Sequence, residues 1–417
     1  MNGNISLNAV KILRILESRG FQAYIVGGAV RDILMGRSPQ DFDICTDALS
    51  SQMKEIFGSL GLKTVLVGEK YGTVQVCLNG EFFEVTTFRT DDEYIDSRHP
   101  ESVSFSTDIA DDLKRRDFTV NALACSVSKN GEVKIIDIFE GQPDIKNKII
   151  RAVGDPRERF SEDALRMIRA VRFSAKLGFD IEPGTKSAIL SLAEKINLVS
   201  MERISAEIEK ILLSDNPEKF LDLSDLNLLK NIMPFLDEEI KRNKSDKINM
   251  LRFLEKDFCV RFAALFEIYG DNININELRG LRLKNFDVKN ITNIFSAVKI
   301  IKSSNDCLQS KVFVKRILRG FGKSDINFAS NITDTLYNID MYGIINEIES
   351  NREPYKLSDL KINGDNIINI TDEKPGKKIG GILSECLEYV IENPDKNNYA
   401  ELVGFVKELL TTDKLLK

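Results

Sequence analysis

The sequence of 417 residues contains a single histidine, His99. A catalytic triad that uses histidine would depend on that residue alone, and metal sites built from several histidines are excluded. The six cysteines have no C-x-x-C spacing, which argues against a zinc ribbon or a disulfide framework and predicts reduced, mostly buried thiols. Any catalysis would therefore depend on carboxylates and cations, with or without a metal ion.

Long hydrophobic runs are also absent. No uncharged apolar stretch approaches the roughly 18 residues that a membrane span needs. The first four residues, Met1–Asn4, lack the basic and then apolar pattern of a signal peptide. We therefore expect a cytoplasmic protein without a membrane partner. The length predicts two or more domains, and a hydrophobic content of 42% is enough to fill their cores.

The net charge of −6 gives little reason by itself to expect a nucleic-acid partner. One segment differs from this average, because residues 279–323 contain 11 Lys and Arg but only Asp287 and Asp306 as acids. Such a local excess of positive charge attracts phosphate backbones. The alternative is a solvated helix face, which has the same composition.

The periodicity of the chain predicts a mixed α/β region followed by helices. Asn79-Gly80 separates two β-rich runs, and this dipeptide is the strongest short-range signal for a hairpin. We therefore expect antiparallel neighbours at 73–78 and 81–88, which excludes an all-parallel sheet. After about Pro156 the pattern becomes helical. The first helix is predicted at Leu7–Ser18, and other β-rich runs lie at 21–26, 64–67 and 133–138.

A glycine turn follows the first β-rich run. Tyr24–Val26 leads into Gly27-Gly28, and a helical pattern begins directly after them. Backbone N–H groups in such a turn can close on a phosphate, aided by the start of the helix. Arg31 lies one turn further on and could reach the same anion. A tight turn with only a structural role is the alternative.

Two aspartates follow, in a pattern that alternates with apolar residues. Phe42 and Ile44 should face a core, which leaves Asp41 and Asp43 together on the other face. Two such carboxylates repel each other unless a cation lies between them, and oxygen ligands suit Mg²⁺. With Glu84 from the hairpin, three carboxylates would suit in-line displacement at phosphorus. Taken singly, each could instead be a solvated surface carboxylate.

These motifs together resemble those of class II CCA-adding enzymes and bacterial poly(A) polymerases. The resemblance rests on Gly27–Asp32 and on Asp41–Asp43, and residues 115–122 are similar to the R-R-D-x-T-x-N-A element of the family. It implies that Arg116 contacts the nucleotide and that Asp117 faces the sugar. From the residues alone, this element could equally be a structural cluster of ion pairs.

Residues 162–166 resemble the E-D-x-x-R element of the same family. A helix beginning near Ser161 would place Asp163 and Arg166 on one face. A carboxylate acceptor beside a guanidinium donor matches the amino donor and ring-nitrogen acceptor that cytosine and adenine share. Guanine and uracil present the opposite order, so this pair would select C and A. The alternative is an ordinary ion pair on a helix surface.

Three further segments extend the resemblance. Arg169 and Arg172 continue the helix face at spacings of three, and the resemblance implies that they help to hold the nucleotide. The polar loop 89–100, which contains His99, resembles the flexible loop of enzymes that add all of CCA. Residues 201–208 resemble a helix-turn element of the family, whose Glu202, Arg203 and Glu207 would brace the neighbouring helices rather than touch the substrate.

The resemblance implies a CCA-adding tRNA nucleotidyltransferase. Mg²⁺ would be held by Asp41 and Asp43, Glu84 would support the attacking hydroxyl, and Gly28 with Arg31 would hold the triphosphate. The partners would be tRNA, CTP and ATP. The remaining alternatives are an A-adding enzyme or poly(A) polymerase, and a non-catalytic RNA-binding protein.

The domain organisation follows from the same resemblance. We predict a multidomain protein in which a nucleotidyltransferase head with a mixed, partly antiparallel sheet precedes three all-helical parts. The head would span residues 1–148, a neck with the base pocket 149–213, a body 214–330, and a tRNA-binding tail 331–417.

Overall fold

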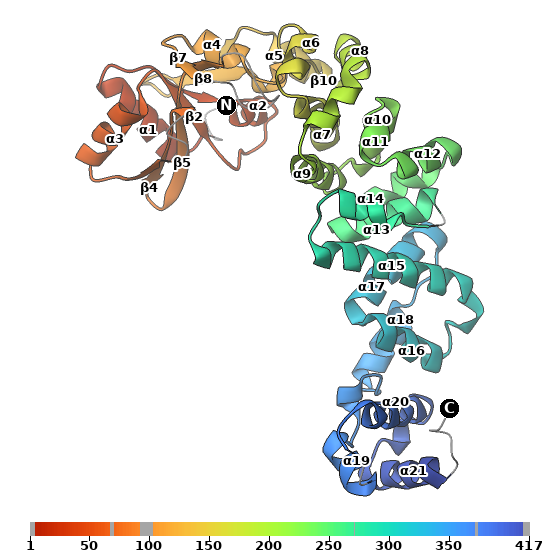
Figure 1. The fold of residues 1–417 in the computed structure, drawn as a ribbon. Helices are drawn as coiled ribbons and strands as arrows, with labels where there is room; N and C mark the ends of the chain where they lie inside the picture. Colours follow the sequence, from red (N-terminus) through yellow and green to blue (C-terminus); the bar gives the residue numbers. More distant parts are fainter. Residues whose placement is uncertain (1–4, 67–70, 92–102, 271, 372–373, 412–417) are drawn as a thin grey trace. The chain divides into compact units, whose positions relative to one another are not determined.

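A computed structural model describes residues 5–66, 71–91, 103–270, 272–371 and 374–411 (Figure 1). The chain divides into two compact units, Met1–Arg242 with Asn274–Leu283, and Asn243–Ile273 with Lys284–Lys417. The predicted division into four parts is finer than this and stays a prediction. None of the helices in the described part of the chain combines the length and the apolar character that crossing a membrane requires.

A seven-stranded mixed sheet occupies the N-terminal part of the first unit (Figure 1). Its order is β3-β4-β5-β2-β1-β8-β9; β2 and β5 are parallel, and the other neighbours are antiparallel. The predicted mixed sheet is therefore confirmed. The strands are β1 (Ala23–Val26), β2 (Asp43–Thr46), β3 (Lys63–Leu66), β4 (Thr73–Leu78), β5 (Glu81–Thr87), β8 (Leu123–Val127) and β9 (Val133–Asp137).

The β4–β5 hairpin explains why the sheet cannot be all parallel. Asn79 and Gly80 both have positive φ, 53° and 84°, which a two-residue hairpin turn of the favoured hand requires. The register places Val74 opposite Val85. Val85 and Phe83 are buried while Glu84 between them is exposed, so one face of the hairpin packs on the core and the other is open. The predicted hairpin is confirmed.

Helices cover this sheet and continue the first unit. Helix α1 begins where the Ser6 side chain accepts a hydrogen bond from the Ala9 N–H, and it has the predicted bounds, Leu7–Ser18. The others are α2 (Gly28–Leu34), α3 (Ser50–Ser59), α4 (Ile109–Lys114), α5 (Gly141–Asn147), α6 (Pro156–Glu162), α7 (Leu165–Leu177), α8 (Pro183–Leu192), α9 (Met201–Leu212), α10 (Leu221–Asp225), α11 (Leu229–Ile232), α12 (Pro234–Arg242) and α14 (Ile275–Gly280). Two short sheets pair β6 (Arg89–Asp91) with β7 (Val103–Phe105) and β10 (Ile149–Ile150) with β11 (Asp180–Ile181).

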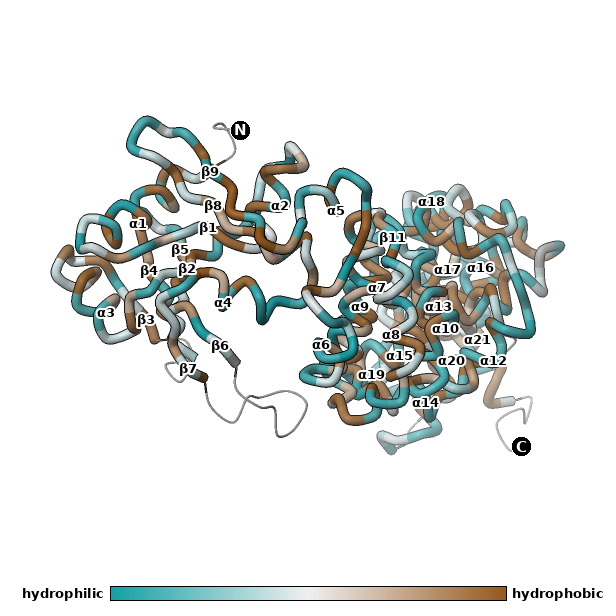
Figure 2. The backbone as a smooth tube through the Cα atoms, turned by 90° about the horizontal axis from the view of Figure 1, so that it is seen from above, coloured by the Kyte–Doolittle hydropathy of each residue, from teal (hydrophilic) through white to brown (hydrophobic). Residues whose placement is uncertain are grey.

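The second unit contains helices joined by turns and loops, and its described residues form no strand. Hydrophobic and hydrophilic residues alternate along its helices, as expected for elements with one buried face (Figure 2). A separate core forms near its C-terminal end around Ile382, Leu387 and Val406. The helices are α13 (Phe258–Tyr269), α15 (Asn285–Ser303), α16 (Lys311–Phe321), α17 (Lys323–Tyr337), α18 (Tyr342–Ser350), α19 (Gly364–Thr371), α20 (Lys377–Glu392) and α21 (Tyr399–Thr411).

Candidate active site

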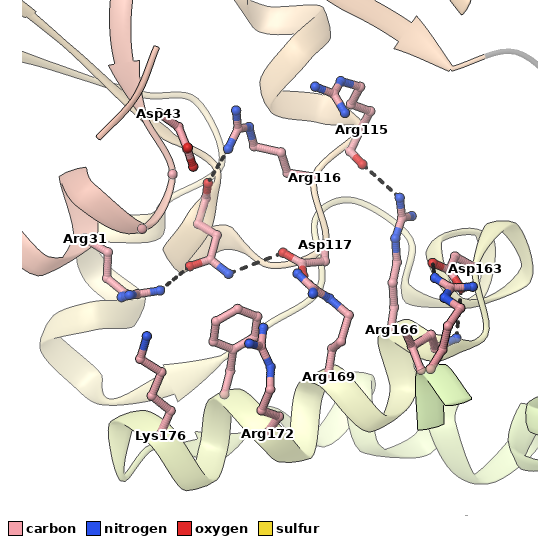
Figure 3. Close-up of a pocket in the computed structure, with 16 residues that line it drawn as sticks. Arg31, Asp43, Arg115, Arg116, Asp117, Asp163, Arg166, Arg169, Arg172 and Lys176 are labelled. Carbon is pink, nitrogen blue, oxygen red and sulfur yellow. Dashed lines mark hydrogen bonds and ion pairs between the residues drawn. The ribbon is translucent and has the colours of Figure 1, made fainter. Parts of the chain in front are cut away.

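A polar cavity of about 520 Å³ lies within the first unit (Figure 3). Eight cationic and three anionic side chains line it, so it is suited to an anionic ligand. Nine of the eleven site residues predicted from the sequence are in its wall: Gly28, Arg31, Asp43, Arg116, Asp117, Asp163, Arg166, Arg169 and Arg172. Asp41 and Glu84 are not among the lining residues.

The glycine turn forms one wall of the cavity. Gly27 has φ of 72° and ψ of −132°, and its N–H donates to the carbonyl of Leu123 over 2.9 Å. A Cβ at this position would lie 2.8 Å from Nη1 of Arg116, so glycine is needed both for the backbone conformation and for the approach of Arg116. Buried Arg31 donates from Nη1 to Oδ1 of Asn121 over 2.6 Å and pairs with Asp32.

Two of the predicted carboxylates, Asp43 and Glu84, are neighbours where β2 and β5 run side by side. Ile44 lies opposite Val85 in this parallel pair, so Asp43 at the start of β2 is beside Glu84. The pKa of Asp43 is raised above its ordinary value, first because the surrounding protein removes water from the carboxylate; Arg116 opposes the shift, while Glu84 and Asp41 add to it. The negative charges of these three carboxylates repel one another, and a bound cation would relieve that repulsion.

The carboxylates around Asp43 fit a metal ion that is bound by few protein ligands. Within the described ranges of the chain, no three His, Cys, Asp or Glu side chains gather closely enough to form a metal cage. Mg²⁺ commonly takes only one or two protein carboxylates and completes its shell with water and substrate phosphates. The arrangement around Asp43 is compatible with that use.

Two adjacent arginines are anchored by one buried carboxylate. Asp112 has no exposed surface; its Oδ1 accepts from Nε and Nη2 of Arg115, and its Oδ2 accepts from Nε and Nη2 of Arg116. Burial alone would raise the pKa of Asp112, but the two guanidinium groups outweigh it and hold the pKa below its ordinary value. Arg116 is thereby fixed between the glycine turn and Asp43.

Asp117 is the centre of a second network. Its Oδ2 accepts from Nε of Arg169 over 2.9 Å, and its Oδ1 accepts from the Asn121 side chain over 3.3 Å. Burial tends to raise the pKa of Asp117, but the ion pair with Arg169 and the hydrogen bonds keep it below its ordinary value. Asn121 therefore links Asp117 to Arg31 (Figure 3).

The prediction of one helix through Asp163 and Arg166 is wrong. Helix α6 ends at Glu162, and Asp163 is extended, with φ of −141° and ψ of 103°. Its Oδ1 accepts from the N–H of Leu165 over 3.0 Å, so the aspartate side chain satisfies a backbone donor at the start of α7 and interrupts the helix. Asp163 and Arg166 still line the same cavity, but from different segments.

Both members of this predicted base-reading pair have intramolecular partners. Asp163 accepts from Nη2 of Arg203 over 2.7 Å through Oδ2. Arg166 pairs with Glu162 through Nη1 and donates from Nη2 to the carbonyl of Arg115 over 3.0 Å. These contacts fix the orientation of a carboxylate and a guanidinium group in the cavity wall (Figure 3).

Three comparisons place the chain among known proteins. The family described as "Poly A polymerase head domain" matches residues 23–151, and "Probable RNA and SrmB- binding site of polymerase A" matches residues 178–240. A CCA-adding enzyme of Streptococcus suis is 34% identical over 97% of this chain and 97% of its own length. That of Ligilactobacillus salivarius is 35% identical over 96% of each. The chain belongs to the CCA-adding enzyme family.

The fold of this family member agrees with a solved structure. The crystal structure of the Bacillus stearothermophilus CCA-adding enzyme in complex with CTP has a TM-score of 0.83 and 30% identity, and the match covers 97% of each chain. The family expected from the head motifs is therefore confirmed, and the match extends over 97% of the chain.

Several residues in the cavity wall of this CCA-adding enzyme family member escaped the sequence reasoning. The centroid of the Phe173 ring lies 4.0 Å from the guanidinium carbon of Arg172 and 5.4 Å from that of Arg169, so this ring is close to two cations of the wall. Lys176 continues the series Arg169, Arg172 at a spacing of four, which is a signal the sequence offered. Leu165 is a further one, whereas Gly27, Arg115, Asn121 and Arg203 lie in recognised motifs but were not among the predicted site residues.

The bracing role expected of residues 201–208 matches two contacts. Glu207 forms an ion pair with Arg172 over 2.7 Å and with Lys210 over 3.0 Å. Burial lowers the pKa of Arg172, and the nearby charge of Arg169 lowers it further, while Glu207 opposes both. Arg203 braces Asp163 and also lines the cavity.

The predicted flexible loop falls largely outside the described residues. The structure describes its first three residues, Arg89–Asp91, as strand β6 paired with Val103–Phe105. Residues 92–102, and with them His99, lie outside the described residues.

The basic segment 279–323 is largely neutralised by carboxylates from elsewhere in the chain. Counting partners in the described parts of the chain, seven of its 11 cations form ion pairs, for example Lys302 with Glu267 over 2.8 Å and Lys323 with Glu349 over 3.1 Å. The other paired cations are Lys299, Lys311, Lys315, Arg316 and Arg319. An excess of charge along the sequence is therefore much smaller in space.

Proposed function

We propose that this chain adds C, C and A to the 3′ end of tRNA from CTP and ATP, with release of pyrophosphate and without a nucleic-acid template. The proposal is supported by full-length similarity to CCA-adding enzymes and by the crystal structure of one of them with CTP. The observation that carries it to the level of residues is one cavity with Asp43 at one end and Asp163 with Arg166 at the other (Figure 3).

The reaction needs oxygen ligands for a divalent metal ion, and we assign these to Asp41 and Asp43. When bound, Mg²⁺ would lower the pKa of the tRNA 3′-hydroxyl and neutralise charge on the phosphates. Glu84, beside Asp43, would support the attacking side. Arg116, held by Asp112, would keep a guanidinium group beside Asp43 where negative charge develops.

The remaining roles follow the length of the cavity. Gly28 and Arg31 would hold the triphosphate, and Asp117 with Arg169 and Arg172 would position the sugar and phosphates. The side chains of Arg31, Asp117, Arg169 and Arg172 are each held by another residue of the protein. They therefore lose less conformational entropy when a nucleotide binds.

Selection of C and A is assigned to Asp163 and Arg166. The carboxylate would accept from the exocyclic amino group, and the guanidinium group would donate to the adjacent ring nitrogen. Because Arg203 and Glu162 hold these two side chains, the order of acceptor and donor is fixed. Guanine and uracil would leave groups unpaired against this order, which costs several kcal/mol.

The proposal keeps the predicted division of the chain into four parts. These are a head at 1–148, a neck at 149–213, a body at 214–330 and a tRNA-binding tail at 331–417. The head match at residues 23–151 and the polymerase RNA-binding match at 178–240 support its N-terminal half. The cytoplasmic location predicted from the sequence also stays a prediction.

The decisive experiment is nucleotide incorporation into three tRNA transcripts that end at the discriminator base, at C and at CC. We expect all three to be completed to CCA with CTP plus ATP, and extension to stop there. Addition of A to the CC-ended transcript alone would identify an A-adding enzyme. Long A tracts on any RNA would identify a poly(A) polymerase, and no incorporation with retained RNA binding would identify a non-catalytic protein.

A further inference from the structure

Lys176 is a cation of the cavity wall to which none of the roles above is assigned. It lies on α7, one turn after Arg172. Each of the other seven cations of the wall pairs with a carboxylate. Among the residues for which the structure gives positions, Lys176 has no hydrogen-bond or ion-pair partner. Its ammonium group is therefore available to a ligand.

The electrostatic surroundings of Lys176 favour an anion. Partial loss of water lowers its pKa, and the charges of Arg31, Arg172 and Arg37 lower it further, while Asp32 alone opposes them. A cation surrounded by cations is stabilised when a negatively charged group enters between them. Because three of these neighbours are arginines, which stay protonated, the unfavourable charge cannot be relieved by loss of their protons.

The position of Lys176 identifies which part of a nucleotide would meet it. Asp163 and Arg166 lie at one end of the cavity, and Arg31, Asp43 and Lys176 lie at the other (Figure 3). A nucleotide with its base at the first end extends its phosphates toward the second. We infer that Lys176 binds the terminal phosphates of the incoming nucleotide, which CTP and ATP share and which leave as pyrophosphate. This inference rests on the proposed function, and it adds a further cation of α7 to the residues that hold the phosphates.

The test compares nucleotides with and without the terminal phosphates. CTP, ATP, CMP and AMP are titrated onto the full-length protein and onto Lys176→Met, Lys176→Arg and Lys186→Met. Lys176 is exposed to the cavity, so a Met side chain of similar length should not disturb the fold. Lys186 is an exposed lysine of α8 outside the cavity wall, and Lys186→Met is the matched control.

We expect Lys176→Met to lower the affinity for CTP and for ATP by about tenfold each, which is the loss typical of one hydrogen bond to a charged group. CMP and AMP should bind as they do to the unchanged protein, and Lys176→Arg should restore most of the affinity. In the presence of tRNA, the KM for both triphosphates should rise by the same factor. Lys186→Met should change none of these values.

Two results would overturn the inference. If Lys176→Met binds CTP and ATP with unchanged affinity, Lys176 makes no contact with the terminal phosphates. If its affinities for CMP and CTP fall equally, Lys176 supports the fold of the cavity instead. The proposed function is tested separately, by completion of CCA on tRNA by the unchanged protein. If that reaction fails but the expected binding pattern is observed, the proposed function is rejected, while the contact between Lys176 and the triphosphate is still supported.

Discussion

Two regions of this molecule are rich in cations, and they differ in the kind of cation and in what holds it. The cavity wall has seven arginines and one lysine, and the carboxylates that pair with the arginines include buried Asp112 and Asp117. The segment 279–323 has four arginines and seven lysines, and pairs such as Lys323 with Glu349 are partly exposed. A guanidinium group has five donors, so an arginine that pairs with a carboxylate still has donors for a phosphate. A surface lysine in an ion pair is a largely neutralised point charge.

The comparison explains why a count of charge along the sequence selected only one of these regions. The segment 279–323 is conspicuous because its carboxylate partners, such as Glu267 and Glu388, lie far away in the sequence. The cavity has its excess of cations only after folding, since its lining residues extend from Gly27 to Arg203. Binding sites for anions are therefore better identified from donors that remain free in space than from linear charge.

The largest effect should follow from a change that leaves every cation of the cavity in place. Asp43→Asn keeps the size of the side chain but removes a carboxylate ligand. Loss of metal-assisted stabilisation amounts to several kcal/mol, so nucleotide incorporation should fall by about 10³-fold or more. Single-turnover incorporation into a CC-ended tRNA measures this. Glu55→Gln, at an exposed carboxylate of α3 in the same sheet region, should retain normal activity. A rate for Asp43→Asn within tenfold of the unchanged protein would contradict the assignment.

Two further variants each remove one carboxylate, one from each region. Asp112→Asn replaces a carboxylate that has no exposed surface by one neutral acceptor for two arginines, and it should reduce the free energy of unfolding by about 3 kcal/mol. Glu388→Gln affects Arg316 and Arg319 at the surface and should cost less than about 1 kcal/mol. Urea unfolding of the two variants measures the difference. Equal losses would mean that burial does not distinguish the two regions.

The same buried carboxylate predicts a dependence of stability on pH. The pKa of Asp112 in the folded protein lies below its ordinary value of 3.8, so its stabilising contribution is complete above that value. It is lost as the pH falls below 3.8 and through the lower pKa of the folded state. Urea unfolding between pH 6 and pH 3 should therefore show a shallower loss for Asp112→Asn than for the unchanged protein. A parallel loss in both proteins would assign the acid sensitivity to other carboxylates, of which Asp117 is one.

A smaller effect separates backbone strain from crowding at the glycine turn. Gly27→Ala introduces a Cβ at a positive φ and 2.8 Å from Arg116, whereas Gly20→Ala introduces one at φ of 88° with no atom within 4 Å. Both variants should lose about 1 kcal/mol from the strained backbone, and Gly27→Ala should lose further stability and most of its affinity for CTP. Thermal unfolding and CTP titration measure these losses. Equal behaviour of the two variants would mean that Arg116 does not need its position over Gly27.

The sequence predicted the sheet more fully than the site. The hairpin at Asn79-Gly80 and the bounds of α1 follow from local chemistry, namely turn residues, a capping serine and apolar periodicity. The break at Asp163 did not follow, because the flanking sequence is strongly helical and the side chain acts as a cap only in competition with that pattern. The anchor at Asp112 was missed for a different reason. Nothing in its local sequence distinguishes a buried carboxylate with two arginine partners from an exposed one.

The smallest effect tests the second region directly. Lys289 on α15 is exposed and makes no ion pair within the described ranges, whereas Lys323 pairs with Glu349. If the segment contacts a phosphate backbone, Lys289→Gln should reduce the slope of log affinity for tRNA against log salt concentration by about one, the loss expected for one phosphate contact. Lys323→Gln should leave the slope nearly unchanged, because its charge is already balanced. Filter binding from 50 to 200 mM salt measures both slopes. Equal slopes for Lys289→Gln and the unchanged protein would mean that Lys289 makes no phosphate contact. An equal reduction by both variants would mean that the ion pairs of this segment open when tRNA binds, and the linear charge count would then be the better guide to this region.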